Sequence, residues 1–182
     1  MPAAGWCGEC LRDPPAFDDV LSAYAYHFPL DRLLHRFKYS ADFAVGACLG
    51  AALARRVEAA PRPNLVLATP MSDKRLRERG FNQALWLARR VACAASLPLD
   101  ARSLHKPVHT PPQTGHDRRL RRRNLRGAFA VRRRLDGLHV AVVDDVVTTG
   151  ATLHELAIVL KSAGAARVTG WVLARVPPPK AG

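Results

Sequence analysis

Apolar residues occur in two patterns along the chain, short unbroken runs and longer segments with an apolar residue at every third or fourth position. The short runs predict strands, and they lie at 19–28 (a strand or a hairpin), 64–70, 138–143 and 167–176. The longer segments predict helices, and they lie at 29–39, 42–60, 81–96, 117–129 and 150–165. Strands that alternate with helices predict βαβ units. We therefore expect an α/β fold with a mainly parallel sheet covered on both faces.

The segments between these elements set the expected domain limits. Three prolines and a glycine predict a loop at 105–116. The length of 182 residues favours one domain, 17–176, between a short N-terminal segment, 1–16, and a Pro-rich tail, 177–182. No run of 18 apolar residues appears and the first residues do not form a signal peptide. We therefore expect no membrane insertion and a cytoplasmic location.

One segment, VAVVDDVVTTGATL (140–153), joins an apolar strand to two acids and then to a threonine-rich turn that opens a helix. Ligands of parallel sheets bind beyond the carboxyl ends of strands, where we expect Asp144 and Asp145. The turn offers helix N–H groups, hydroxyls and close approach at Gly150, which suit a phosphate. Carboxylates repel a phosphate but accept hydrogen bonds from neutral hydroxyls. The segment therefore predicts a ribose 5-phosphate site, with the diol on the aspartates.

Other interpretations of this segment are weaker. The sequence has neither a G-x-x-x-x-G-K-[ST] loop nor a G-x-G-x-x-G turn after a strand, so a P-loop is excluded and dinucleotide binding is unsupported. The simplest alternative is purely structural, with the acids ending a strand and Thr149 capping a helix.

The net charge of +13 is concentrated in the middle of the chain, where residues 61–136 hold 18 Lys and Arg against 5 Asp and Glu. Such a distribution indicates contact with a polyanion, either a nucleic acid or a phosphorylated small molecule. One basic segment, 69–83, follows a predicted strand, so we expect it in a turn at the edge of the sheet where ligands bind. Another part, 117–126, would place like charges four residues apart on a helix, at roughly 0.2–0.5 kcal/mol each. An anion against this segment would offset that cost, and a solvated charged surface is the alternative.

Together these stretches resemble a known family. VVDDVVTTGAT (142–152) resembles the phosphoribosyl pyrophosphate (PRPP) motif of the type I phosphoribosyltransferases. LATPMSDKRLRERGFNQALWLA (67–88) and QTGHDRRLRRRNLRGAF (113–129) precede it, and in this order the three are similar to the ComF family of competence-associated proteins. The resemblance covers most of the chain from about residue 20. The PRPP motif marks the superfamily, whereas RERGFNQA with RRRNLRGAF narrows it to ComF.

The resemblance implies a type I phosphoribosyltransferase fold with a small basic hood, which binds PRPP together with Mg²⁺. It implies catalytic roles for Asp144, Asp145, Lys74 and Arg75. It implies that the ribose phosphate is held by Val146, Val147, Thr148, Thr149, Gly150, Ala151 and Thr152. It implies a pyrophosphate loop that also contains Met71, Ser72, Asp73, Arg77 and Arg79. The arginines expected to form a lid over PRPP or a track for single-stranded DNA are Arg118, Arg119, Arg122 and Arg123.

The cysteines allow a separate prediction. Cys7 and Cys10 form a C-x-x-C pair, but six preceding residues cannot supply the strand of a thioredoxin motif. Cys48 and Cys93 lie in helical patterns and are expected to be buried thiols. ComF proteins often begin with a zinc ribbon made of two cysteine pairs, so the resemblance implies that 1–16 is a remnant of one. Zinc takes four ligands, and Cys7 and Cys10 would supply half of a Zn²⁺ site.

Three functions remain open on the sequence alone. The first is an enzyme that transfers the phosphoribosyl group of PRPP to an acceptor that no residue identifies. The second is a single-stranded-DNA-binding factor that retains the PRPP site as a sensor or a relic. The third is an interaction module for a competence helicase or a recombination mediator.

Overall fold

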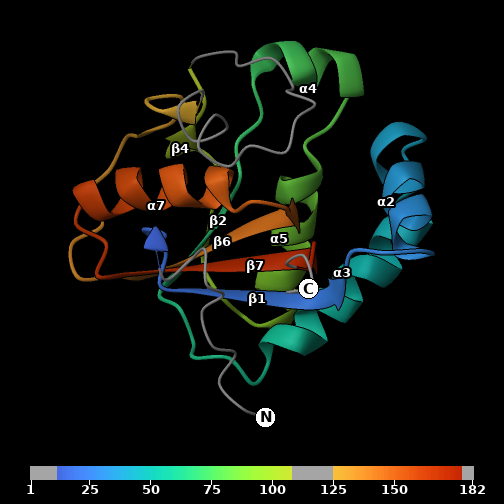
Figure 1. The fold of residues 1–182 in the computed structure, drawn as a ribbon, viewed down its shortest axis with the longest axis horizontal. Helices are drawn as coiled ribbons and strands as arrows, with labels where there is room; N and C mark the ends of the chain where they lie inside the picture. Colours follow the sequence, from blue (N-terminus) through green and yellow to red (C-terminus); the bar gives the residue numbers. More distant parts are fainter. Residues whose placement is uncertain (1–11, 108–124, 178–182) are drawn as a thin grey trace.

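The computed structural model describes residues 12–107 and 125–177 (Figure 1). Their elements, in chain order, are β1 (Asp19–Ala25), α2 (Leu30–Tyr39), α3 (Phe43–Val57), β2 (Leu65–Ala68), α4 (Asp73–Arg79), α5 (Gln83–Ala94), β3 (Leu99–Asp100), β4 (Leu104–His105), β5 (Ala130–Val131), β6 (His139–Val147), α7 (Ala151–Ser162) and β7 (Arg167–Arg175). None of the helices within these ranges is long and apolar enough to cross a membrane.

The main sheet has five strands in the order β1-β7-β6-β2-β3, and every neighbouring pair is parallel. The predicted α/β class with a mainly parallel sheet flanked by helices is confirmed. The segment at 19–28 is a strand and not a hairpin, because β1 pairs in parallel with β7 and Leu21 lies opposite Trp171. A small antiparallel pair, β4 with β5, stands apart from the sheet and was not predicted.

Helices cover both faces of the sheet (Figure 1). Alternate residues of a strand point to opposite faces, and β6 follows this rule. Val140 and Val142 pack in a cluster with α7, whereas Ala141 and Val143 pack in a second cluster with α2, α3 and α5. The apolar run of β6 is therefore continuous because both of its faces are buried.

Local hydrogen bonds fix where the helices beside the sheet begin. The Asp42 carboxylate accepts from the Val45 N–H at 3.0 Å and so caps α3. The Asn82 side chain accepts from the Ala84 N–H at 2.9 Å and donates to the Thr69 carbonyl at 3.1 Å. The start of α5 is therefore tied to the chain just beyond β2.

Two local predictions at the ligand edge were wrong. Residues 73–79 form the helix α4, where a turn was expected. Strand β6 does not end before Asp144, because β7 supplies partners as far as Val147 opposite Arg175. Strand β2, in contrast, stops at Ala68 opposite Val143. The two aspartates therefore extend beyond β2 while β7 still supports them, which opens a space on one side of β6.

The cysteine prediction also needs correction. Cys48 and Cys93 are both exposed, because they lie on the outer sides of α3 and α5.

Most of the helix predicted at 117–129 lies outside the described residues.

Candidate functional site

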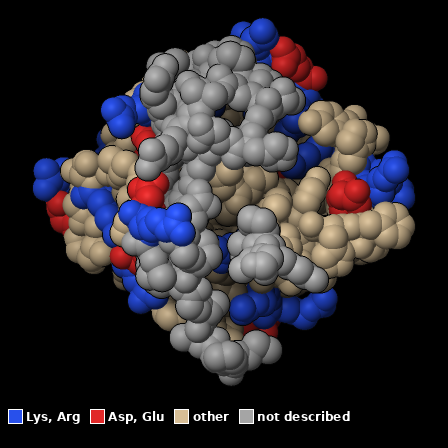
Figure 2. Space-filling view, viewed as in Figure 1, with Lys and Arg blue, Asp and Glu red and all other residues tan. Residues whose placement is uncertain are grey.

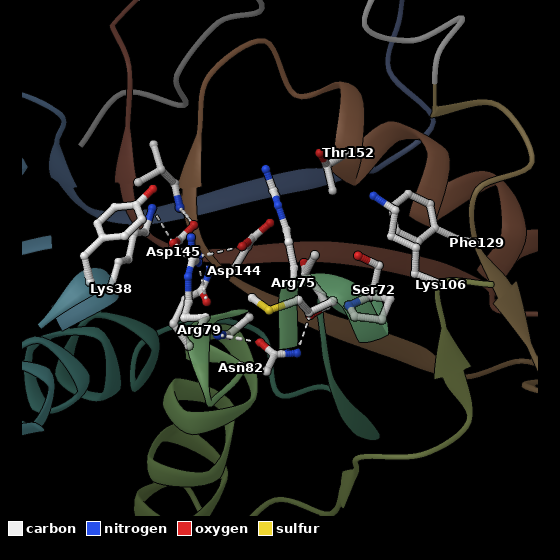
Figure 3. Close-up of a pocket in the computed structure, with 17 residues that line it drawn as sticks. Lys38, Ser72, Arg75, Arg79, Asn82, Lys106, Phe129, Asp144, Asp145 and Thr152 are labelled. Carbon is white, nitrogen blue, oxygen red and sulfur yellow. Dashed lines mark hydrogen bonds and ion pairs between the residues drawn. The ribbon is translucent and has the colours of Figure 1, made fainter. Parts of the chain in front are cut away.

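A pocket of about 310 Å³ opens at the carboxyl ends of β2 and β6 (Figure 3). The described residues that line it come from α2, the segment after β2, α4, the start of α5, the residues that flank β4 and β5, β6 and α7. They are Lys38, Tyr39, Thr69, Pro70, Met71, Ser72, Arg75, Arg79, Asn82, Gln83, Ala84, Lys106, Phe129, Asp144, Asp145, Val146 and Thr152. The pocket occupies the position that the sequence predicted for a ligand.

Asp145 is buried and its carboxylate is held on both oxygens. The Lys38 ammonium lies 2.5 Å from Oδ2, and the Gln83 amide donates to the same oxygen at 3.2 Å. Oδ1 accepts from the Val146 N–H at 2.7 Å. Burial alone would raise the pKa of Asp145, but the charge and hydrogen bond of Lys38 hold it below its ordinary value. Asp145 is therefore the charged member of the pair.

Asp144 has the opposite character. Its Oδ1 accepts from the Asp145 N–H at 2.8 Å. Burial, followed by the adjacent charge of Asp145, raises the pKa of Asp144 to about 7, although the hydrogen bond from the Asp145 N–H lowers it in part. At neutral pH Asp144 therefore exchanges a proton readily, whereas Asp145 keeps its charge.

Three cationic side chains line other parts of this pocket: Arg75, Arg79 and Lys106. The Lys106 ammonium lies 5.4 Å from the centre of the Phe129 ring. Burial lowers the pKa of Lys106, and the nearby positive charge of Arg75 lowers it further. Two cations that repel one another beside a pocket favour an anionic ligand. Lys106 directly follows β4 and Phe129 directly precedes β5, so the pairing of these two short strands brings the two residues to the same place.

Helix α4 divides the residues predicted for the pyrophosphate loop. Arg75 and Arg79 are four residues apart, so they share one face of the helix, and that face lines the pocket. Met71 and Ser72, which precede α4, also line the pocket. The remaining members of the predicted set are exposed and do not line it, and these are Asp73, Lys74 and Arg77. The position of Lys74 thus gives no support to its expected catalytic role.

The turn predicted to hold a phosphate connects β6 to α7. Gly150, at its end, has a φ of 74° and immediately precedes the first turn of α7. The Thr149 hydroxyl accepts from the Ala151 N–H at 3.4 Å. Thr152 and Val146 line the pocket, and the other predicted members of the segment do not, these being Val147, Thr148, Thr149, Gly150 and Ala151. The turn itself supplies no side chain that lines the pocket, and the one hydroxyl of the segment there belongs to Thr152, in the first turn of α7.

Two predicted sets lie outside the described residues. They are the arginines of the basic segment (Arg118, Arg119, Arg122 and Arg123) and the cysteines of the zinc prediction (Cys7 and Cys10). Within 12–107 and 125–177, no three His, Cys, Asp or Glu side chains gather in a way that could hold a metal ion.

Sequence reasoning missed several residues of the pocket. Gln83 stood within a quoted motif but received no role, although its place at the start of a helix beyond a strand was a usable signal. Lys38 gave no such signal, because it lies on α2, far in sequence from the aspartate that it contacts. Tyr39 and Lys106 lie outside the motifs, whereas Asn82 and Phe129 lie within them but received no role at this site.

Comparison with known proteins agrees with the motifs. No protein-family model matches the chain. It is 36% identical to the DNA utilization protein YhgH of Salmonella typhi over 175 residues, which cover 93% of this chain and 77% of that protein. It is 32% identical to competence protein F of Haemophilus influenzae over 178 residues, which cover 93% of this chain and 78% of that protein.

Two solved structures with a similar arrangement of strands and helices illustrate the likeness of fold. The allosteric regulatory enzyme of purine biosynthesis shares 25% identity and matches 70% of this chain and 26% of its own, with a TM-score of 0.48. Adenine phosphoribosyltransferase from Thermoanaerobacter pseudethanolicus shares 20% identity and matches 72% of this chain and 70% of its own, with a TM-score of 0.45. With its motifs in their expected order and its identity to YhgH and competence protein F over nearly its whole length, the chain belongs to the ComF family.

Proposed function

We propose that this protein binds PRPP with Mg²⁺ in the pocket at the ends of β2 and β6. The observation that carries the proposal is the composition of the pocket: two adjacent acids on β6 share it with Arg75, Arg79 and Lys106. A ligand that combines a sugar diol with phosphates needs both kinds of group. In this arrangement the diol lies on Asp144 and Asp145 and the 5-phosphate lies towards Thr152. The pyrophosphate lies towards the cations.

The same arrangement suits phosphoribosyl transfer. Negative charge grows on pyrophosphate as its bond to the sugar breaks, and fixed cations stabilise that charge most. Arg75 and Lys106, already close enough for their charges to interact, would each gain from it. Magnesium in such sites takes one or two carboxylates together with phosphate oxygens and would help neutralise the leaving group. Asp144 is the carboxylate that fits this role, because Asp145 is already paired with Lys38.

The test is isothermal titration with PRPP, with and without Mg²⁺. We expect binding only with the metal, and a Kd at least tenfold higher in Asp144→Asn. The matched control is Asp136→Asn, which removes an exposed acid that pairs with Arg134 and does not line the pocket. Equal affinity in the Asp144 variant and the unaltered protein would refute the ribose assignment.

We further propose that this PRPP site serves the handling of DNA during competence in the cytoplasm. The names of the relatives support this, since one is a DNA utilization protein and another a competence protein. The concentration of positive charge in 61–136 supports it as well. A titration with single-stranded DNA tests direct contact with the nucleic acid. Release of pyrophosphate from PRPP, measured with candidate acceptors, separates an enzyme from a non-catalytic factor that contacts DNA or a competence helicase.

A further inference from the structure

We propose that Gln83 is a positioning residue, whose amide links the ribose-side carboxylate of Asp145 to the guanidinium of Arg79 on α4. This inference rests on the proposed function, because it assigns a role within the same pocket. It predicts that the sugar end and the pyrophosphate end of the ligand are held in a fixed relation by one buried amide.

The hydrogen bonds of Gln83 carry this inference. The residue is 9% exposed and begins α5. Its Nε2 donates to Asp145 Oδ2 at 3.2 Å, while its Oε1 accepts from Arg79 Nη1 at 2.9 Å. The two partners fix the orientation of the amide, since the reverse orientation would set donor against donor and acceptor against acceptor. A neutral amide is a side chain that can serve a carboxylate and a guanidinium at once.

The link immobilises both partners. Asp145 Oδ2 receives Lys38 as well as Gln83, so the plane of the carboxylate is fixed. The Arg79 guanidinium lies 4.9 Å from the centre of the Tyr39 ring while it donates to Gln83. An arginine held in this way loses less side-chain freedom when it binds an anion than a free one would. Gln83 therefore prepares the pocket for a ligand that it need not touch.

The neighbouring residue shows what a purely structural amide does in this place. Asn82 accepts from two N–H groups at the start of α5 and donates to the Thr69 carbonyl, so all these partners belong to the backbone. Both side-chain partners of Gln83 are instead charged side chains that line the pocket. This difference assigns the two adjacent amides to different tasks.

Two substitutions test the role through PRPP titrations in Mg²⁺ at pH 5.5 to 8, each compared with the unaltered protein at the same pH. Gln83→Met keeps the length of the side chain but makes neither hydrogen bond. We expect its Kd to rise about 5- to 30-fold at every pH, as is typical for a residue coupled to two partners.

Gln83→Glu should behave differently, because the new carboxyl replaces an amide that contacts Asp145 on β6 and Arg79 on α4, and it shares the pocket lining with Asp144 on β6 and Lys38 on α2. When ionised it repels Asp145, and when protonated it can donate to Asp145 and accept from Arg79 as glutamine does. Its loss of affinity should therefore exceed that of Gln83→Met at pH 8 and shrink as the pH falls. A merely structural amide would not produce this recovery.

A matched control is Asn64→Ala, which removes an amide that accepts from the His139 N–H at 2.8 Å and does not line the pocket. It should lower the melting temperature and leave the PRPP affinity unchanged. An unaltered Kd in Gln83→Met, or equal pH-independent losses in both Gln83 variants, would overturn the positioning role alone. If the unaltered protein fails to bind PRPP, the proposed function is overturned and the positioning role with it.

Discussion

At the scale of single residues, the acid pair shows how two neighbouring carboxylates acquire different properties. Asp145 has a cation within 2.5 Å and two hydrogen-bond donors. Burial makes the charged form of Asp144 costly, no cation among its described contacts offsets that cost, and its pKa rises to about 7. The pair can thus be kept in one pocket at a lower electrostatic cost, because Lys38 compensates the charge of Asp145 and Asp144 takes up a proton more readily than a free aspartate.

This division predicts opposite effects of two similar substitutions on stability. Asp144 has a pKa raised above that of the unfolded chain, so its contribution to stability falls as the pH rises from about 4 through 7. Asp144→Asn removes the ionisation, and the variant should gain stability relative to the unaltered protein over that range. The gain at pH 8 should be on the order of 2 kcal/mol, because one pKa unit corresponds to about 1.4 kcal/mol and the pair is coupled.

Asp145→Asn provides the opposite case. It leaves the Lys38 ammonium, whose side chain is 20% exposed, without its carboxylate. The variant should lose on the order of 2 kcal/mol at pH 7, since removing one partner of a buried pair exposes the desolvation cost of the other. Because the pKa of Asp145 is lowered, the stability that this carboxylate contributes is lost only when the pH falls below the ordinary pKa of an aspartate. Urea unfolding at pH 4.5, 7 and 8 measures both effects, and parallel curves for the two variants would contradict them.

At the scale of elements, α4 determines which basic residues reach the ligand. A helix presents residues four positions apart on the same face, and here that face carries Arg75 and Arg79. In an extended loop, the same arginines would not be sorted into those that face the pocket and those that face away from it. The arginine between them, Arg77, is exposed and does not line the pocket.

We expect pyrophosphate binding to follow this division. Arg75→Met should raise the Kd of Mg-pyrophosphate about tenfold or more, because a hydrogen bond to a charged group is worth roughly 1.5–3 kcal/mol. Arg77→Met removes the same group from the same helix, but Arg77 is exposed and does not line the pocket. This variant should therefore change the Kd less than about twofold, as is typical of an exposed charge. Fluorescence or calorimetric titration of the two variants side by side measures the difference. A larger effect at Arg77 would show that α4 turns its other face to the anion.

The elements also show what the sequence could and could not predict. The main strands and the long helices were predicted because each buries enough apolar residues to leave an unbroken apolar run or an apolar residue at every third or fourth position. Helix α4 buries none of its residues, and Leu76, its one apolar residue, is 40% exposed, so no such period exists. The strands β3, β4 and β5 are two residues long, too short to form a recognisable apolar run. The contact between Lys38 and Asp145 depends on tertiary packing and has no local signal.

At the scale of the whole molecule, positive charge is distributed more widely than the pocket. Figure 2 shows Lys and Arg side chains at several separate places around one face, among the described residues. The pocket arginines and Lys106 account for only part of the net charge of +13. A long polyanion could contact charges that PRPP cannot reach.

The basic segment allows this to be measured. If Arg118 and Arg122 follow a DNA strand, affinity for single-stranded DNA should fall with salt, with a log–log slope of roughly −0.7 per phosphate neutralised. Replacing both by Gln should flatten the slope by about one to one and a half units on that basis, while PRPP binding stays nearly intact. If they cover PRPP instead, the same variant should bind PRPP more weakly, and its DNA affinity should be low from the start. Equal salt slopes with and without the arginines would remove the track from consideration.

The order of the strands has a consequence for synthesis of the protein on the ribosome. Strand β1 is the first strand of the sheet to be made, but its partner is β7, the last strand among the described residues. The central strands β6 and β7 also emerge late, so the earlier segments cannot complete a sheet as they leave the ribosome. Chain elongation proceeds at about 5–20 residues per second, so β1 and the apolar side of α2 stay uncovered for several seconds. Folding of this domain should therefore be largely post-translational, with the early segments as natural targets for chaperones.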